Sequence, residues 1–449
     1  MSATFASLRY RNYRLWFGGA LVANTGTWMQ RVAQDWLVLT QLSNNSGVAL
    51  GVVTGLQFAP TLALSPWAGV LADRVDRRRL LMITQGAMGL LAAGLGALVL
   101  GGHAQLWHVY VFALVLGVAA AFDSPARQTF VAEMVPPERL SNAVGLNSAS
   151  FNAARMIGPG VAGLLIAAIG TGWVFVVNAV SFGATIFALL AMRRSELRPM
   201  PTMARARGQI REGIAYVRGR SDIVVILVVM SVVSAFGLNF QMTSALMART
   251  VFHKGAGEYG LLGSVLAIGS LSGALLAARR EQPRVRLVIG SAFAFGVAAG
   301  VMALMPTYTS FAVACIPVGL ASLTMMTAAN ATVQISTDPA VRGRVMSLYM
   351  MVLLGATPIG SPVIGWIGET FGARWSIGVG AIASILVATG AAIWTVRAWH
   401  ITVRYRLTTR PHLVVTHPAG ARDQAASRQA TQAPPDAATA AGVDAATAA

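Results

Sequence analysis

Charged side chains are scarce in this sequence. Asp, Glu, Lys and Arg make up 11% of its 449 residues, against about 25% in a typical soluble globular domain. The chain has a single lysine, Lys254, which is followed by Gly255 and Ala256. A G-x-x-x-x-G-K-[ST] loop, which would bind the phosphates of ATP, is therefore absent. This composition excludes an ordinary soluble domain and an ATPase built on that loop.

Motifs for metal binding, disulfides and hydrolysis are also missing. The one cysteine, Cys315, cannot form an internal disulfide. The six histidines are scattered without the spacing of metal ligands, and there is no G-x-S-x-G nucleophile motif. We therefore expect no enzyme, no metal and no cofactor. Any uphill transport would draw on an ion gradient, with protons as the expected ion, or on a partner subunit.

Long apolar runs are abundant instead. Hydrophobic residues make up 55% of the chain, and its mean hydropathy is +0.62. Runs of about 20 apolar residues are long enough to cross a bilayer as helices, and they are too continuous for β-barrel strands. The sequence predicts twelve such helices, at 14–41, 47–72, 80–101, 106–128, 142–169, 172–192, 222–248, 258–279, 286–305, 309–335, 345–369 and 374–396.

The net charge of +18 is confined largely to alternate connections between these runs. Arginines crowd the start of the chain and the connections after the second, sixth and eighth runs, whereas "QLSNNSG", "GGHAQLWH", "GTGW" and "MPTYTS" have no Lys or Arg. Arg249, Lys254 and Arg374 are exceptions. This asymmetry predicts a multi-pass protein of the cytoplasmic membrane with both termini in the cytoplasm. It also favours anionic lipid, and not nucleic acid, as the partner of the basic loops.

The two halves of the chain look related. A shift of 202 residues aligns seven positions, which are Gly117, Pro137, Gly158, Val161, Gly163, Gly170 and Trp173, with identical residues in the second half. Six helices per half give a parallel repeat, as in some secondary transporters. We expect an all-α membrane protein with twelve transmembrane helices in two six-helix bundles around a central cavity. Its parts would be bundles at 1–192 and 222–396, a cytoplasmic linker at 193–221 and a disordered tail at 397–449.

The connection after the second run reads "GVLADRVDRRRL". It resembles the loop motif of the major facilitator superfamily at Gly69, Leu71, Asp73, Arg74, Arg77 and Arg78, although Asp76 stands where glycine is usual. The resemblance implies a cytoplasmic latch between the halves, with Asp73 facing the segment that starts at Arg342. The aligned loop of the second half has Ala277 in place of the aspartate. A plain basic cytoplasmic loop would explain the arginines, but not Asp73.

The fifth run contains "ARMIGPGVAGLL". It resembles the antiporter motif of the same superfamily at Gly158, Pro159, Gly160 and Gly163, which in that family accompanies proton-coupled export. Generic small-residue helix packing is the alternative, and the second-half copy "GSPVIG" favours it. Most of residues 5–395 look like the branch that contains the enterobactin exporter and bacterial macrolide efflux proteins, with the weakest resemblance in the second half.

The first run carries charges within "WMQRVAQDW". A charged side chain at the centre of a membrane helix costs about 2.5–3.5 kcal/mol on insertion scales, so each one needs a reason. Arg31 and Asp35 are one helical turn apart and can pair directly. We expect Asp35 to carry the proton and Arg31 to modulate it. A static bridge between the two is the alternative.

Other polar and aromatic residues are candidates for the substrate path. Asn24, Gln34 and Trp28 share the first run, and Arg155 lies one turn before Gly158 and could meet an anionic substrate or Asp35. Asp123 and Arg127 are expected to form a gate or a structural pair near the cytoplasmic end of the fourth run. A few aromatic side chains would complete the pocket, chosen from Trp16, Trp28, Trp36, Phe58, Trp67, Phe151, Phe236 and Phe240.

These features together predict a monomeric secondary transporter that exports hydrophobic or amphipathic, drug-like small molecules in exchange for protons by alternating access. A siderophore exporter is the alternative within transport, because Arg155 suits an anionic ligand. A membrane sensor or scaffold that transports nothing is the alternative from another class, and proton-linked flux distinguishes it.

Overall fold

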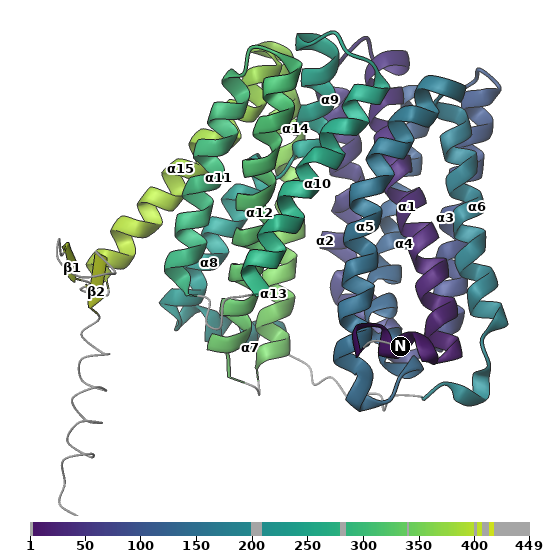
Figure 1. The fold of residues 1–449 in the computed structure, drawn as a ribbon, viewed down its shortest axis with the longest axis horizontal. Coiled ribbons are helices and arrows are strands. Elements are labelled where there is room, and N and C mark those ends of the chain that lie inside the picture. The colour runs from purple at the N-terminus through teal and green to yellow at the C-terminus, as the bar shows by residue number, and fades with distance from the viewer. Residues whose placement is uncertain are drawn as a thin grey trace, which may run out of the picture. The chain divides into compact units, whose positions relative to one another are not determined.

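The computed structural model describes residues 3–198, 209–278, 284–338, 341–398, 402–405 and 413–416 (Figure 1). By its internal contacts the chain divides into a unit of Met1–Ala388, which holds nearly all of the helices, and a unit of Thr389–Ala449. Each unit is considered by itself below. The candidate site lies wholly within the first one.

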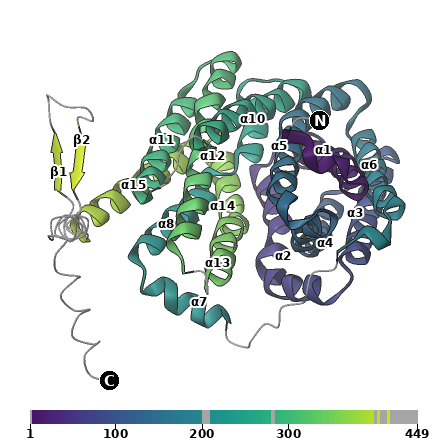
Figure 2. The ribbon, with the colours of Figure 1, turned by 60° about the horizontal axis from the view of Figure 1, so that its bottom comes forward.

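The first half of the chain forms six long helices, which lie around one another in Figure 2. A short 3-10 helix, η1 (Ala3–Arg9), precedes them, and a π-helical turn, η2 (Val38–Leu42), continues the first. The six are α1 (Arg11–Leu37), α2 (Gly47–Arg74), α3 (Arg77–Leu100), α4 (Leu106–Met134), α5 (Pro137–Ile169) and α6 (Thr171–Ala191).

The second half begins with η3 (Arg194–Glu196) and the short helix α7 (Gln209–Arg218). The following segments are α8 (Ser221–Val232), η4 (Val233–Gly237), α9 (Phe240–Leu246), η5 (Met247–Val251), α10 (Ala256–Ala278), α11 (Val285–Leu304), α12 (Tyr308–Ser336), α13 (Arg342–Gly355), α14 (Thr357–Thr370) and α15 (Ala373–Ala398). Figure 1 draws α10 beside α5, in agreement with the contacts between these two helices.

Among the described residues, eleven helical stretches are long and apolar enough to cross a membrane. They correspond to eleven of the twelve predicted runs. The first run also forms a helix, α1, whose 27 residues would extend about 40 Å. It is less apolar than the rest because it carries Gln30, Arg31, Gln34 and Asp35. Much of this polar surface is buried inside the protein, and Asp35 is 7% exposed.

Two of the eleven stretches are interrupted. Ser221–Val251 changes from α-helix to π-helix at Val233 and leaves helical geometry at Leu238 and Asn239 before α9. Arg342–Thr370 is divided at Ala356, just before Pro358. A proline lacks the N–H that continues a helix, which explains the second interruption. The interruption at residues 233–239 contains no proline. It lets the Ala235 carbonyl lie against Gly360 of α14.

Helices from the two halves touch along two seams, α5 with α10 and α2 with α14. Glycines allow both contacts: a methyl group on Gly163 would lie 2.5 Å from the Ala256 carbonyl oxygen, and one on Gly47 would lie 2.5 Å from that of Gly365. Gly163 and Gly365 are equivalent in the 202-residue repeat, and each meets the first turn of a helix in the other half. The repeat seen in the sequence therefore recurs in the packing.

The second unit contains an element that the sequence did not predict. Strands β1 (Thr402–Tyr405) and β2 (Leu413–Thr416) pair antiparallel, with Thr402 opposite Thr416. Both strands lie within the segment 397–449 that we expected to be a disordered tail. The remainder of that prediction, at 399–401, 406–412 and 417–449, falls outside the described residues.

Candidate functional site

Asp35 lies in the last turns of α1, where this helix meets α10. The Tyr259 hydroxyl donates a hydrogen bond of 3.0 Å to Asp35 Oδ2. The Tyr259 ring also stacks on the indole of Trp36, with 5.9 Å between the ring centroids and 19° between the planes. Asp35 is 7% exposed and Tyr259 only 2%. The expected proton carrier is therefore a buried carboxylate held by a residue of the other half of the chain.

The direct pair of Arg31 with Asp35 is not formed in this structure. The Arg31 guanidinium lies 4.8 Å from the centroid of the Trp28 ring and 5.4 Å from that of Phe58, and its Nε is buried without a hydrogen-bond partner. Cation–π contacts of this kind stabilise a desolvated guanidinium. The Arg31 guanidinium therefore lies against two aromatic rings, whereas the Asp35 carboxylate is bonded to Tyr259, although the two residues are only one helical turn apart.

Arg155 belongs to the same region of the first half. It lies one turn after Phe151 on α5, and the Phe151 ring packs edge-to-face on Trp28 with 6.0 Å between centroids. Neither Arg31 nor Arg155 forms an ion pair with a carboxylate within the described part of the chain. We call Trp28, Arg31, Phe58 and Phe151 the arginine–aromatic cluster. It joins α1, α2 and α5.

The other polar residues of α1 lie in different surroundings. Gln34 is 2% exposed, so it does not face an open cavity here, whereas Asn24 is half-buried. Gln30, which the sequence analysis did not select, accepts a hydrogen bond from the Asn178 amide of α6. Polar contacts on α1 therefore serve packing within the first half as well as the candidate site.

The antiporter-like motif of α5 packs closely, as its small residues predicted. A methyl group on Gly158 would lie 2.6 Å from Trp28 Cβ of α1, and one on Gly160 would lie 2.9 Å from Ser264 Oγ of α10. Pro159 lies against Gly260 and Gly263. The Ser264 hydroxyl also donates a 2.7 Å hydrogen bond to the Met156 carbonyl. The motif therefore binds α5 to α1 on one side and to α10 on the other.

A polar clasp, which the sequence analysis missed, closes the second seam. Glu369 at the end of α14 accepts hydrogen bonds from the Ser46 hydroxyl (2.6 Å) and the Val48 backbone N–H (3.0 Å) at the start of α2. Nearby, Arg249 Nε donates to Asn45 Oδ1 at 3.2 Å. These contacts join the halves at the end of the helices where α2 and α10 begin. The partners are more than 200 residues apart, so no local pattern revealed them.

The basic motif after α2 is bonded within the first half. Arg77 forms an ion pair with Glu133 of α4, and Arg78 donates to the Leu189 carbonyl of α6 at 2.7 Å. Arg74 is exposed. The side chain of Asp73 lies outside the described residues, so its expected contact with the segment starting at Arg342 stays a prediction, as does the role of Gly69.

Asp123 and Arg127 form the expected pair, with 2.9 Å between Nε and Oδ2. Asp123 also accepts hydrogen bonds from the Thr84 hydroxyl (2.8 Å) and the Gln85 amide (2.7 Å) of α3. The Arg127 guanidinium lies 5.5 Å from the Trp16 ring centroid. All of these partners belong to the first half, which favours a structural role over that of a gate between halves.

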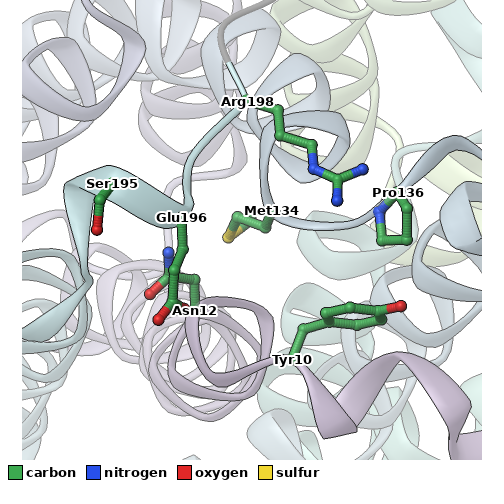
Figure 3. Close-up of a pocket in the computed structure, with 7 residues that line it drawn as sticks. All are labelled: Tyr10, Asn12, Met134, Pro136, Ser195, Glu196 and Arg198. Atoms are coloured by element: carbon green, nitrogen blue, oxygen red, sulfur yellow. The ribbon is translucent and has the colours of Figure 1, made fainter.

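A hollow of about 330 Å³ lies at the end of the helices where the chain begins, away from Asp35 (Figure 3). Its walls come from the start of α1, the connection of α4 to α5 and the segment after α6, with Tyr10, Asn12, Met134, Pro136, Ser195, Glu196 and Arg198. None of these was a candidate in the sequence analysis. In the described part of the chain, no three His, Cys, Asp or Glu side chains gather as metal ligands would.

Curated proteins similar to this chain are transporters. It is 25% identical to the staphyloferrin A transporter of Staphylococcus aureus over 83% of this chain and 94% of that protein. It is 30% identical to the multidrug efflux pump Tap of Mycolicibacterium fortuitum over 79% and 88% of the two chains. The macrolide efflux protein A of Streptococcus pyogenes is 24% identical over 78% and 87%.

Solved structures agree on the fold. A bacterial homologue of the human lysosomal transporter Spinster, in an inward-facing and unoccupied conformation, gives a TM-score of 0.64 at 16% identity, covering 86% of this chain and 95% of that one. A peptide transporter of the POT family in complex with sulfate gives 0.70 at 14% identity, covering 86% and 94%. The family model described as transmembrane secretion effector matches residues 2–414. This multi-pass membrane protein therefore belongs to the transmembrane secretion effector family of the major facilitator superfamily and is a transporter, not an enzyme.

Proposed function

We propose that the protein exports hydrophobic or amphipathic small molecules in exchange for protons. Twelve helices would span the membrane, α1 together with the eleven apolar stretches, as two six-helix bundles around a central cavity. The equivalent contacts of Gly163 and Gly365 across the two seams support this arrangement. Similarity to the pump Tap and to macrolide efflux protein A supports export of drug-like compounds.

The orientation follows from the charges. With both termini in the cytoplasm, the ends of α1 and α5 and the starts of α2 and α10 lie on the outer side. The clasp at Glu369 and the close packing of Gly163 on α10 then close the protein toward the outside. Alternating access requires these seams to open and a second contact to form on the cytoplasmic side. The exposed residue Arg74 and the neighbouring Asp73 are where that second contact would form.

The observation that carries the proposal is the burial of Asp35 with no described cation at ion-pair distance. A carboxylate inside a membrane protein is costly, and such residues mark ion or proton pathways in transporters. Asp123 and Glu133, two other carboxylates of the first half, both have an arginine partner. Asp35 is therefore the group that can gain and lose a proton without breaking a structural ion pair.

Everted membrane vesicles test this proposal. A panel of drug-like compounds is added to vesicles that hold an imposed pH gradient, and partial collapse of the gradient reports exchange. Wild-type protein is expected to give collapse with at least one compound, and Asp35→Asn to give none. Undiminished proton coupling in Asp35→Asn would rule out Asp35 as the carrier. A panel without any proton-linked flux would favour the sensor or scaffold.

An anionic ligand such as a siderophore is the second candidate. The unpaired guanidinium groups of Arg31 and Arg155 favour it, as does similarity to the staphyloferrin A transporter. The change in ligand affinity on protonation of Asp35 has the opposite sign for a cationic drug-like substrate and an anionic siderophore, which separates the two candidates. Protonation of Asp35 removes a negative charge, which weakens the binding of a cation and strengthens that of an anion. Unit charges about 8 Å apart at an effective dielectric of about 20 interact by about 2 kcal/mol, or roughly 30-fold in affinity.

Binding measured at several pH values distinguishes these candidates. On acidification, the affinity of a cationic substrate should fall and that of an anionic one should rise, by up to roughly 30-fold. Arg155→Ala should weaken anion binding at least tenfold while leaving neutral compounds unaffected. If Arg155→Ala bound every ligand with the same affinity as wild type, Arg155 would have a structural role.

A further inference from the structure

The hydrogen bond between Tyr259 and Asp35 joins two helices that belong to different halves of the chain. The two residues are 224 positions apart, and both are buried. The bond lies beside the tightest part of the α5–α10 seam, because Gly260, the next residue, packs against Pro159 and Gly163. The only polar connection between α1 and α10 that we observe in the described residues is therefore made by the candidate proton carrier itself.

Opening this seam would break the bond. Gly158 places α5 directly on Trp28 and Thr25 of α1, so α1 and α5 pack as one block. Tyr259 is on α10, on the other side of the seam. Any movement that separates α10 from α5 also draws the Tyr259 hydroxyl away from Asp35. The stacked Trp36 ring would lose its contact in the same step.

The charged groups around the pair have other partners, so the Asp35 carboxylate relies on the Tyr259 hydroxyl for its hydrogen bond. Arg31, on the same helix, is directed to the Trp28 and Phe58 rings. Glu258, beside Tyr259 on α10, accepts a hydrogen bond from the Gly255 backbone N–H at 3.1 Å. Arg249, in η5 before α10, is bonded to Asn45. Arg155 of α5 lies three residues before Gly158, which packs on Thr25 and Trp28, and it forms no ion pair with Asp35 within the described part of the chain. A hydrogen bond to an ionised carboxylate is about twice as strong as one between neutral groups.

We propose that Tyr259 is a coupling residue that locks the outer seam while Asp35 is ionised. The empty transporter with ionised Asp35 then cannot reorient, whereas protonation of Asp35 weakens the bond and permits reorientation. Substrate binding permits reorientation in the opposite direction, from the cytoplasmic to the outer side. This inference rests on the proposed proton exchange. Without the lock, the empty carrier would open outward without substrate, and a proton taken up there would enter without driving export.

The main test is Tyr259→Phe, which removes the hydroxyl and keeps the ring on Trp36. Tyr308→Phe is the matched control, since the Tyr308 hydroxyl also donates to an acceptor on α10, the Glu258 carbonyl at 2.9 Å, but from α12 of the same half. The full chain, with Cys315 replaced by serine, carries spin labels at His103→Cys and Lys254→Cys, one in each half near the outer ends. The label-to-label distance is measured at alkaline and acidic pH.

Wild type and Tyr308→Phe are expected to shift from the short to the long distance on acidification. Tyr259→Phe should show the long distance at both pH values. Asp35→Asn, which keeps an acceptor oxygen but has no charge, should behave in the same way, and it provides the test if Tyr259→Phe does not fold. A pH-dependent shift in Tyr259→Phe equal to that of wild type would overturn the proposal.

Transport of ethidium in proteoliposomes separates this inference from the proposed function. Tyr259→Phe should retain at least half of the wild-type rate down an ethidium gradient, while its accumulation ratio under an imposed pH gradient falls to about one. Coupled accumulation by both proteins would overturn the lock and leave proton exchange intact. Failure of wild-type protein to couple any compound of the panel to protons would overturn the proposed function, whatever Tyr259→Phe does.

Discussion

The charged side chains of the first half are of two kinds: some stabilise its structure, and others are candidates for a role in transport. Asp123 belongs to the first group, because it receives an ion pair from Arg127 and two further hydrogen bonds while it is 6% exposed. Within the part of the chain that the structure describes, the Asp35 side chain has one hydrogen bond and no ion pair. Both aspartates lie four residues from an arginine in the sequence. The three-dimensional partners, and not the spacing, therefore separate their roles.

Replacing Asp123 tests this division. Asp123→Ala leaves the half-buried Arg127 without its partner, which costs up to about 3 kcal/mol of stability. We expect a lower melting temperature in detergent, and unchanged substrate-to-proton stoichiometry in the protein that remains folded. Arg127→Ala should behave similarly. A stable Asp123→Ala protein whose proton coupling is lost would assign this pair to the transport cycle.

The sequence predicted the candidate residues of α1 and α5 but not their partners. Arg31, Asp35 and Arg155 are conspicuous because charges are rare in apolar runs. Tyr259 and Glu369 have no such signal: a tyrosine is ordinary in a membrane helix, and a glutamate is ordinary at a helix end. Their roles arise from contacts between distant parts of the chain. Local patterns do not contain that information.

Helix positions were predictable because each depends on a continuous apolar run. The ends differ where polar residues extend a helix beyond its run: 106–128 became Leu106–Met134, since residues such as Arg127 and Gln128 continue the helix without being apolar. The change to π-helix at Val233 was not predicted, because no proline marks it. Close packing of the α5 motif was predicted from its glycines, and its partner α10 was not.

The α5–α10 seam gives a prediction for the helices as units. Gly163→Ala adds a methyl group against backbone atoms of Ala256 and Gly257, so α10 must move away from α5. We expect the outer seam to open at all pH values and the accumulation ratio to fall severalfold. Gly145→Ala is the matched control on the same helix, because a methyl group there meets nothing within 4 Å. Equal transport by the two variants would show that the seam tolerates the displacement.

The orientation that we propose for the whole molecule in the membrane rests on its charge asymmetry and can be measured. With Cys315 replaced by serine, His103→Cys in the connection of α3 to α4 should react with a membrane-impermeant thiol reagent added outside intact cells. Arg79→Cys, at the start of α3, should react only in everted vesicles. Both positions are exposed, so access to the reagent depends on sidedness. The reverse pattern would invert the proposed direction of transport.

The central claim is that Asp35 carries the proton that drives export. Its most direct test is the accumulation of a transported compound in proteoliposomes, with the inward pH gradient as the sole energy source, for wild type and Asp35→Asn. Wild type is expected to accumulate the compound uphill, whereas Asp35→Asn should support only exchange that stops at equal concentrations on the two sides. Uphill accumulation by Asp35→Asn equal to that of wild type would contradict this claim.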